Sequence, residues 1–226
     1  MRILILNCDF DKNPETNGAQ LLRSHLSEFN VKVIIRNVFE NQFPTEEELK
    51  TFGGILITGS RASVYEDTEW IKKLVALVRL IDNLGIPTLG ICFGYQIIAQ
   101  TLGGNVQASG KFEEGFKLVE LTREGIRNHL FNGFPQQFKV YQSHGDIANV
   151  LPEKSVVLVI STNSCESYQI RNFFGVQFHP EILYETAVKM AIRDGKDVNK
   201  ILDSVNNNYK LPINILANFV SYCKTR

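Results

Sequence analysis

Short apolar runs alternate with longer stretches of mixed polarity along the first half of the chain. The runs are rich in branched aliphatic residues, as buried strands are, and cover residues 2–7, 31–38, 54–58 and 88–91. In the stretches between them, apolar residues recur at intervals of three and four, which predicts helices over residues 18–29, 67–84 and 93–102 and a helix start near Pro44. This alternation predicts a parallel sheet with helices on both faces.

The pattern changes in the second half, where strand-like segments follow one another with little helix between them. They cover residues 116–121, 138–142, 156–161, 168–171 and 174–178, and we expect them to complete the sheet and add hairpins. From Tyr184 onward the spacing is helical again, with breaks near Gly195 and at Pro212. The expected fold is therefore α/β, with a mostly parallel central sheet flanked by helices and a helical C-terminal extension (182–226), in one domain (1–226).

The composition of the chain limits the classes of protein to which it can belong. The chain has 226 residues and is 44% hydrophobic, which is enough for one sizeable core. Its 24 basic residues balance its 24 acidic residues, so charge gives no argument for binding nucleic acid or an anionic membrane. The first apolar run is too short for a secretory signal, and no run approaches a membrane span. We therefore expect a cytoplasmic protein whose four cysteines are reduced.

One cysteine lies between two glycines where a predicted strand meets a predicted helix, in Gly90–Gly94 (GICFG). In a nucleophile elbow, glycines flank the nucleophile because side chains there would collide across the sharp turn. The free N–H groups of the following helix favour a thiolate at Cys92, and the N–H of Phe93 is a natural oxyanion donor. The alternative is a buried structural cysteine between two packing glycines.

A nucleophilic thiol needs a base, and His179 is the best-placed of the four histidines. It follows a predicted strand and precedes Pro180, and Glu181 is close enough in sequence to hold the other imidazole nitrogen. The alternative is a histidine at a strand end followed by a helix-capping glutamate. His25, in an early amphipathic helix, is expected to be solvated, and His129 has no supporting motif.

With the motifs GICFGYQ (90–96) and FHPE (178–181) in this order, the sequence resembles class I, triad-type glutamine amidotransferases. The resemblance is closest to the glutaminase part of GMP synthase and its stand-alone relatives, and SHGD (143–146) is similar to a loop of that group. It implies a flavodoxin-like fold in which Cys92 attacks the side-chain amide of glutamine. His179 would move the proton, Glu181 would orient His179, and a γ-glutamyl thioester would form and be hydrolysed.

The resemblance also implies binding residues. Thr58-Gly59-Ser60 matches the glycine-rich loop of the family, so the N–H of Ser60 would be the second oxyanion donor beside Phe93. The implied substrate contacts are Gly59, Gln96, Ser143 and Asp146, whose carboxylate suits an α-ammonium group. The family often has Gly-Gly-Pro where this chain has Gly59-Ser60-Arg61, so Arg61 adds a cation that either contacts a carboxylate or is solvated. Tyr95, where His or Met is common, is expected to change only packing.

Three functions remain open at this point. The first is glutamine hydrolysis with ammonia passed to a separate, GMP synthase-like synthetase, because this chain has no P-loop or other nucleotide-binding motif. The second is a stand-alone γ-glutamyl peptide hydrolase. The third is a non-catalytic binding or regulatory module. No cofactor or metal is expected, because the His and Cys residues lack ligand spacing. The extension is expected to pack on its own domain or to form a docking or dimer surface.

Overall fold

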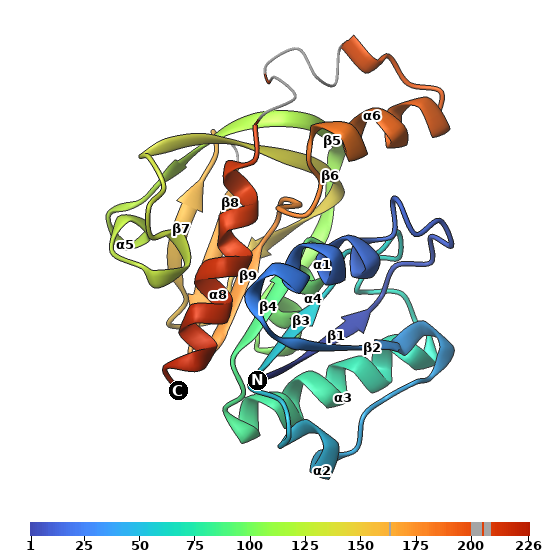
Figure 1. Ribbon diagram of the computed structural model, residues 1–226, viewed down its shortest axis with the longest axis vertical. Coiled ribbons are helices and arrows are strands. Elements are labelled where there is room, and N and C mark those ends of the chain that lie inside the picture. Colours follow the sequence, from blue (N-terminus) through green and yellow to red (C-terminus); the bar gives the residue numbers. More distant parts are fainter. Residues whose placement is uncertain (163, 200–204, 206–208) are drawn as a thin grey trace.

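The computed structural model describes residues 1–162, 164–199, 205 and 209–226, and its strands form one nine-stranded sheet (Figure 1). The strand order is β2-β1-β3-β4-β9-β8-β7-β5-β6. The first five strands in this order are parallel, and each later strand pairs antiparallel with its neighbour. The α/β fold and the completion of the sheet by the second half of the chain are both confirmed.

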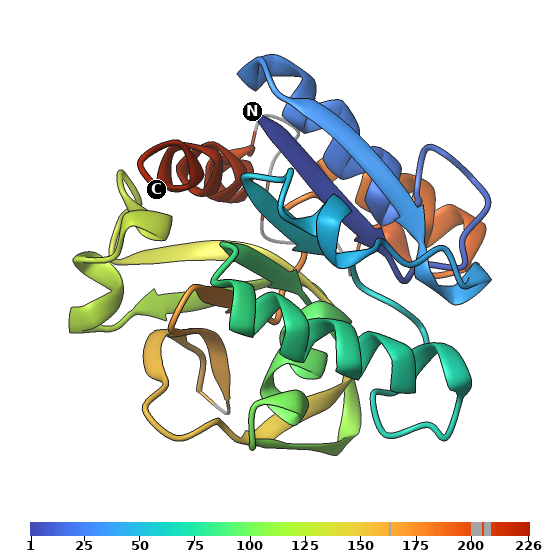
Figure 2. The ribbon, with the colours of Figure 1, turned by 90° about the horizontal axis from the view of Figure 1, so that it is seen from below.

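The parallel half contains the short buried strands that the sequence predicts: β1 (Arg2–Asn7), β2 (Lys32–Asn37), β3 (Gly54–Ile57), β4 (Thr88–Ile91) and β9 (Phe173–Val176). Successive side chains of β1 enter two different cores, as the alternation of a strand requires. Ile3 and Ile5 pack with α1 (Gly18–Leu26) and α8 (Asn214–Lys224), whereas Leu4 and Leu6 pack with α3 (Glu69–Leu84) and α4 (Phe93–Thr101). Figure 2 shows these helices on opposite faces of the sheet.

The antiparallel half consists of β5 (Asn105–Leu121), β6 (Gln137–Val150), β7 (Val156–Ile160) and β8 (Cys165–Ile170). β5 and β6 are much longer than the predicted segments, because they extend together as a ribbon whose mixed polarity gives no strand signal. Consequently Ser143 and Asp146, expected in a loop, lie within β6, where Ser143 is paired with Glu114 and Asp146 with Ala108 of β5.

Short helical elements connect these strands: η1 (Ser27–Phe29), η2 (Val38–Glu40), α2 (Glu46–Leu49), α5 (Arg123–Ile126) and η3 (His129–Phe131). They fill loops between longer elements, and α2 begins just after Pro44, close to the predicted helix start.

The C-terminal extension contains α6 (Tyr184–Arg193), η4 (Leu211–Ile213) and α8. Its breaks fall where the sequence places them, with Gly195 at a positive φ of 65° and Pro212 at the start of η4. Residues 200–204 and 206–208 of the predicted helical extension lie outside the described residues. α8 buries one face in the main core, and α6 packs near Phe116 and Tyr141, so the described extension packs on its own chain. None of the helices in the described part of the chain is long and apolar enough to cross a membrane.

Candidate active site

Cys92 occupies a sharp turn between β4 and α4 with φ 51° and ψ −103°, a conformation that is strained for a residue with a side chain. The flanking glycines make this turn possible. A Cβ on Gly94 would lie 2.2 Å from the carbonyl oxygen of Ile57, and one on Gly90 would lie 2.4 Å from the backbone of Gly94. The spacing Gly-x-Cys-x-Gly is therefore a steric requirement of this turn.

The thiol of Cys92 faces backbone and side-chain partners from β6 and from the segment that follows β9. Its Sγ lies 3.9 Å from the carbonyl oxygen of Ser143, to which it donates, and 3.8 Å from Nε2 of Gln177. Phe93 opens α4, where the first N–H groups have no acceptor within the helix. Ser60 and Cys92 line one cavity, which is described below, and the hydroxyl of Ser60 accepts from the N–H of Ala62 at 3.1 Å.

His179 and Glu181 follow β9, the strand that pairs with β4, so the topology brings them beside Cys92. Nδ1 of His179 lies 2.8 Å from Oε1 of Glu181, whose side chain is 2% exposed. Burial alone lowers the pKa of His179, but the nearby Glu181 carboxylate and the Cys92 sulfur raise it more, so that the net pKa lies well above its usual value. The imidazolium form of His179 is therefore favoured at neutral pH.

A second layer surrounds Glu181. Nε2 of His25 lies 3.2 Å from the carbonyl oxygen of Glu181, so the prediction that His25 is simply solvated is wrong. Helix α1 turns this ring toward the segment after β9, a long-range contact that helical spacing does not reveal. Asp9 and Glu181 both lie beside Gly18, where a Cβ would be 3.7 Å from Oδ2 of Asp9 and 3.6 Å from Oε1 of Glu181. The carboxylate of Asp9 accepts from the N–H of Gly18 at 2.8 Å, and burial raises its pKa.

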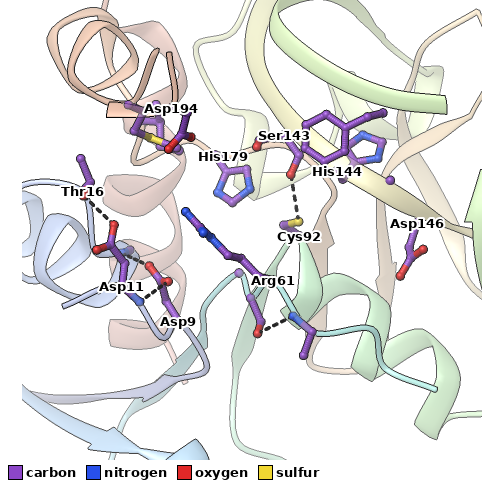
Figure 3. A pocket seen from close by; sticks show the side chains of 18 of the residues that line it. Asp9, Asp11, Thr16, Arg61, Cys92, Ser143, His144, Asp146, His179 and Asp194 are labelled. Atoms are coloured by element: carbon purple, nitrogen blue, oxygen red, sulfur yellow. Dashed lines mark hydrogen bonds between the residues drawn. The ribbon is translucent and has the colours of Figure 1, made fainter. Parts of the chain in front are cut away.

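The remaining expected contacts from β6 and α4 are already held by protein partners. Nε2 of Gln96 donates to the carbonyl oxygen of Asp146 at 2.9 Å and to Oε1 of Gln177 at 3.2 Å. The carboxylate of Asp146 accepts from the hydroxyls of Ser63 at 2.6 Å and Tyr65 at 3.0 Å. These bonds fix Asp146 at a distance from the thiol, as Figure 3 shows.

His144 is a buried member of the same strand. It is 4% exposed and lines the cavity, and neither ring nitrogen has a hydrogen-bond partner among the described residues. Burial lowers its pKa, so the ring is neutral at pH 7.

Tyr95 does more than the packing role expected of it. Its ring is buried against Tyr168, its hydroxyl donates to the carbonyl oxygen of Cys165 at 2.9 Å, and its own carbonyl accepts from the hydroxyl of Tyr168 at 2.9 Å. These bonds join α4 to β8 behind the turn at Cys92.

A cavity of about 490 Å³ joins these groups, a size that suits a ligand larger than a single small amide. Figure 3 shows Cys92 and His179 between two groups of lining residues. We call one group the β6 arm, which comprises Gln96, Ser143, His144, Gly145 and Asp146. We call the other the α6 arm, which comprises Asp11, Thr16, Arg61, Arg193, Asp194 and Lys196.

Most of the α6 arm was not anticipated from the sequence. The sequence could have indicated Asp11, and Asp9 near it, as residues of a binding site. Both follow β1 at the carboxyl edge of the parallel strands, where open α/β sheets bind ligands. No sequence pattern indicates Arg193, Asp194 and Lys196, because only the packing of α6 brings them to the cavity.

Residues 16–196 match the family model for glutamine amidotransferase class-I, and the chain belongs to that family. It is 33% identical over 149 residues to gamma-glutamyl peptidase 4 of Arabidopsis thaliana, a match that covers 64% of this chain and 59% of the peptidase. It is 34% identical over 170 residues to a glutamine-hydrolyzing GMP synthase of Thermobifida fusca, covering 74% of this chain and 30% of that enzyme. The chain thus spans less than two thirds of the length of either relative.

Solved structures share the fold along nearly the whole chain. A glutamine amidotransferase from Thermotoga maritima superposes with a TM-score of 0.82 at 22% identity, covering 99% of this chain and 97% of that one. A glutamine amidotransferase from Methylobacillus flagellatus gives a TM-score of 0.79 at 16% identity, covering 97% of this chain and 93% of that one. At these identities the likeness concerns the fold alone.

Proposed function

We propose that this protein is a cysteine hydrolase of γ-glutamyl amides. The observation that carries the proposal is the placement of Cys92 on a strained strand-to-helix turn, beside a His179 that is held by Glu181 at 2.8 Å. A nucleophile, a base and a group that orients the base, at the edge of one cavity, are the parts that acyl transfer needs. We place the reaction in one domain (1–226) and in the cytoplasm, where thiols stay reduced.

The reaction begins when the thiolate of Cys92 attacks the γ-carbonyl carbon and a C–S bond forms. The N–H groups of Phe93 and Ser60 stabilise the oxyanion. The C–N bond then breaks as His179 gives its proton to the departing nitrogen, which leaves a γ-glutamyl thioester. Water then attacks the thioester carbon as His179 takes up one of its protons, and a C–O bond forms. The C–S bond breaks, which releases glutamate, whose carboxyl proton passes to solvent, and restores the Cys92–His179 ion pair. The raised pKa of His179 supports this cycle, because an imidazolium must be present to protonate the leaving group.

The β6 arm suits the glutamyl end of the substrate. Asp146 keeps free lone pairs after accepting from two hydroxyls, so its carboxylate can also accept from an α-ammonium group. Gln96, Ser143 and Gly59 line the same cavity, and Gly59 lies against His179 and Cys92. Their roles in binding are part of the proposal.

Two leaving groups are compatible with this chemistry. If the substrate is glutamine, ammonia leaves and passes to a separate synthetase of the GMP synthase type. If the substrate is a γ-glutamyl peptide, an amino acid or peptide leaves. The shape of the cavity favours an amino acid or peptide as the leaving group, because the cavity continues past His179 into the α6 arm and has room for more than ammonia. A non-catalytic binding or regulatory role is the third candidate.

The test is to incubate the purified protein with glutamine and, separately, with a γ-glutamyl dipeptide, and to quantify glutamate, ammonia and released amino acid. We expect turnover that disappears in Cys92→Ala, and labelling of Cys92 by a chloromethyl ketone analogue of glutamine. Faster release of ammonia from glutamine would favour the amidotransferase reaction, and faster cleavage of the dipeptide would favour the peptidase. Absence of both turnover and labelling would leave the non-catalytic role as the remaining candidate.

A further inference from the structure

Four charged side chains of the α6 arm, those of Asp11, Arg193, Asp194 and Lys196, are held in ion pairs. Arg193 donates to Asp11 at 2.5 Å and to Thr16 at 3.2 Å, and it forms two bonds to Asp194 at 2.7 and 3.0 Å. Its guanidinium is therefore fully engaged in joining α6 to the segment after β1. These bonds make Arg193 a part of the cavity wall that is not free to bind a ligand anion.

Lys196 is also engaged. Its ammonium group lies 2.6 Å from Oε1 of Glu114 on β5 and 5.5 Å from the ring centroid of Phe112. Like Arg193, it already has a carboxylate at contact distance.

Arg61 differs from both. It lines the cavity and is exposed, and within the described residues no carboxylate lies within 4.0 Å of its guanidinium. It acts on Asp11 and Asp194 only over a longer distance, and Arg193 is the closer cation to both. Among the cations that line the described cavity, Arg61 is thus the one left free to pair with a ligand.

The position of Arg61 decides which part of a substrate it faces. It directly follows Ser60, the expected oxyanion donor, and Figure 3 shows its guanidinium turned toward Asp11 on the His179 side of Cys92, away from Asp146. The leaving nitrogen must lie on that same side, because His179 is the group that protonates it. The glutamyl end, bound by the β6 arm, lies on the other side.

We propose that Arg61 binds a carboxylate carried by the leaving group, so that the preferred substrates are γ-glutamyl amino acids or peptides with a free carboxylate. This inference rests on the proposed function and names the substrate class of the same site. A guanidinium without an internal partner matches a carboxylate in charge and in planar geometry. The surrounding acids are themselves engaged. Asp11 and Asp194 both pair with Arg193, Asp194 also lies 3.9 Å from the ammonium group of Lys196, and Asp9 accepts from the N–H groups of Gly18 and Asp11.

The experiment compares kcat/KM for γ-glutamyl-alanine with kcat/KM for γ-glutamyl-alaninamide, which differ only in the carboxylate. For the natural chain we expect a preference of about tenfold for the free carboxylate, as one charge-assisted hydrogen-bonded contact gives. In Arg61→Gln we expect this ratio to fall to about one, mainly through a higher KM for γ-glutamyl-alanine. Arg61→Lys should keep part of the preference. The matched control is Arg79→Gln, an exposed arginine on α3 outside the cavity, which should keep the full ratio.

The outcomes separate this inference from the proposed function. If both substrates are cleaved with equal efficiency by the natural chain, or if Arg61→Gln lowers both rates equally, the assignment of Arg61 is overturned while the hydrolase remains. If neither these substrates nor glutamine is cleaved and the glutamine-like electrophile does not label Cys92, the proposed function falls and the assignment of Arg61 falls with it.

Discussion

Gly59 presents its bare Cα to the imidazole of His179: a Cβ at this position would lie 2.8 Å from Cε1 of the ring and 3.6 Å from the Cβ of Cys92. In Gly59→Ala the ring or the loop must therefore shift. A displacement of about 1 Å between reacting groups can cost about a hundredfold in rate, and we expect kcat to fall by about that factor. Steady-state kinetics checks this, with thermal unfolding as the control for folding. A variant with normal kcat would show that the ring has room to move.

The pKa of His179 should fall when the charge of Glu181 is removed. In Glu181→Gln burial still lowers the pKa, and the nearest carboxylate that raises it has been removed. NMR titration of the His179 Cε1–H signal measures this shift directly. The alkaline limb of kcat/KM should move to lower pH together with it, because the imidazolium is then lost earlier. An unchanged titration would mean that Glu181 does not set the charge of the ring.

Stability should depend on pH through the same histidine. Folding raises the pKa of His179 above its ordinary value of 6.5. The stabilisation of the folded state by protonated His179 is therefore complete below pH 6.5 and is lost as pH rises through the folded pKa. The free energy of unfolding, measured by urea denaturation, should therefore decline as pH rises above 6.5. The decline should be smaller in Glu181→Gln. If the variant and the natural chain have the same slope, the charge of His179 is not coupled to folding.

The four cysteines should differ sharply in reactivity. Burial raises the pKa of Cys165 to about 11 and that of Cys223 to about 12, and burial also raises the pKa of Cys8. Cys92 alone lines the cavity beside His179. Mass spectrometry after brief treatment with iodoacetamide at pH 8 should find one alkylated cysteine, Cys92, in the native protein and four in urea. Native labelling at Cys165 equal to that at Cys92 would contradict this.

Gly94→Ala should destabilise the whole fold. Its Cβ would lie 2.2 Å from the carbonyl oxygen of Ile57, so the backbone of α4 or β3 must move, and a loss of about 2–3 kcal/mol is expected from overpacking of this kind. Urea unfolding measures it. The control is Gly145→Ala, where the nearest atom to a new Cβ is Cδ2 of Phe112 at the ordinary distance of 3.5 Å, and where the change should be small.

The parts of the fold that could be predicted from the sequence are those with a local signal. Buried parallel strands such as β1 and β4 are short apolar runs, and the end of α3 at Gly85 follows from a left-handed C-cap with φ 66°. The turn at Cys92 was predictable because its two glycines are a steric requirement that the sequence itself displays.

The parts that could not be predicted depend on long-range contacts. The ribbon of β5 and β6 pairs mostly with itself and exposes much of both faces, so its residues lack the alternation of a half-buried strand. Arg193 reaches Asp11 only because α6 packs over the carboxyl edge of the sheet. His25 reaches Glu181 for the same reason: the two residues lie on elements that meet only in the folded chain.

The adjacency of β4 and β9 has a consequence for the order in which the molecule matures. The strand before Cys92 is synthesised early, whereas the strand before His179 comes only after all four antiparallel strands. Until β9 inserts between β4 and β8, His179 cannot lie beside the Cys92 thiol, and no fragment that ends before this strand contains both residues. Such late, non-local pairing is slow compared with the formation of helices and hairpins. The appearance of a reactive Cys92 on a nascent or refolding chain would thus report the closing step of sheet assembly.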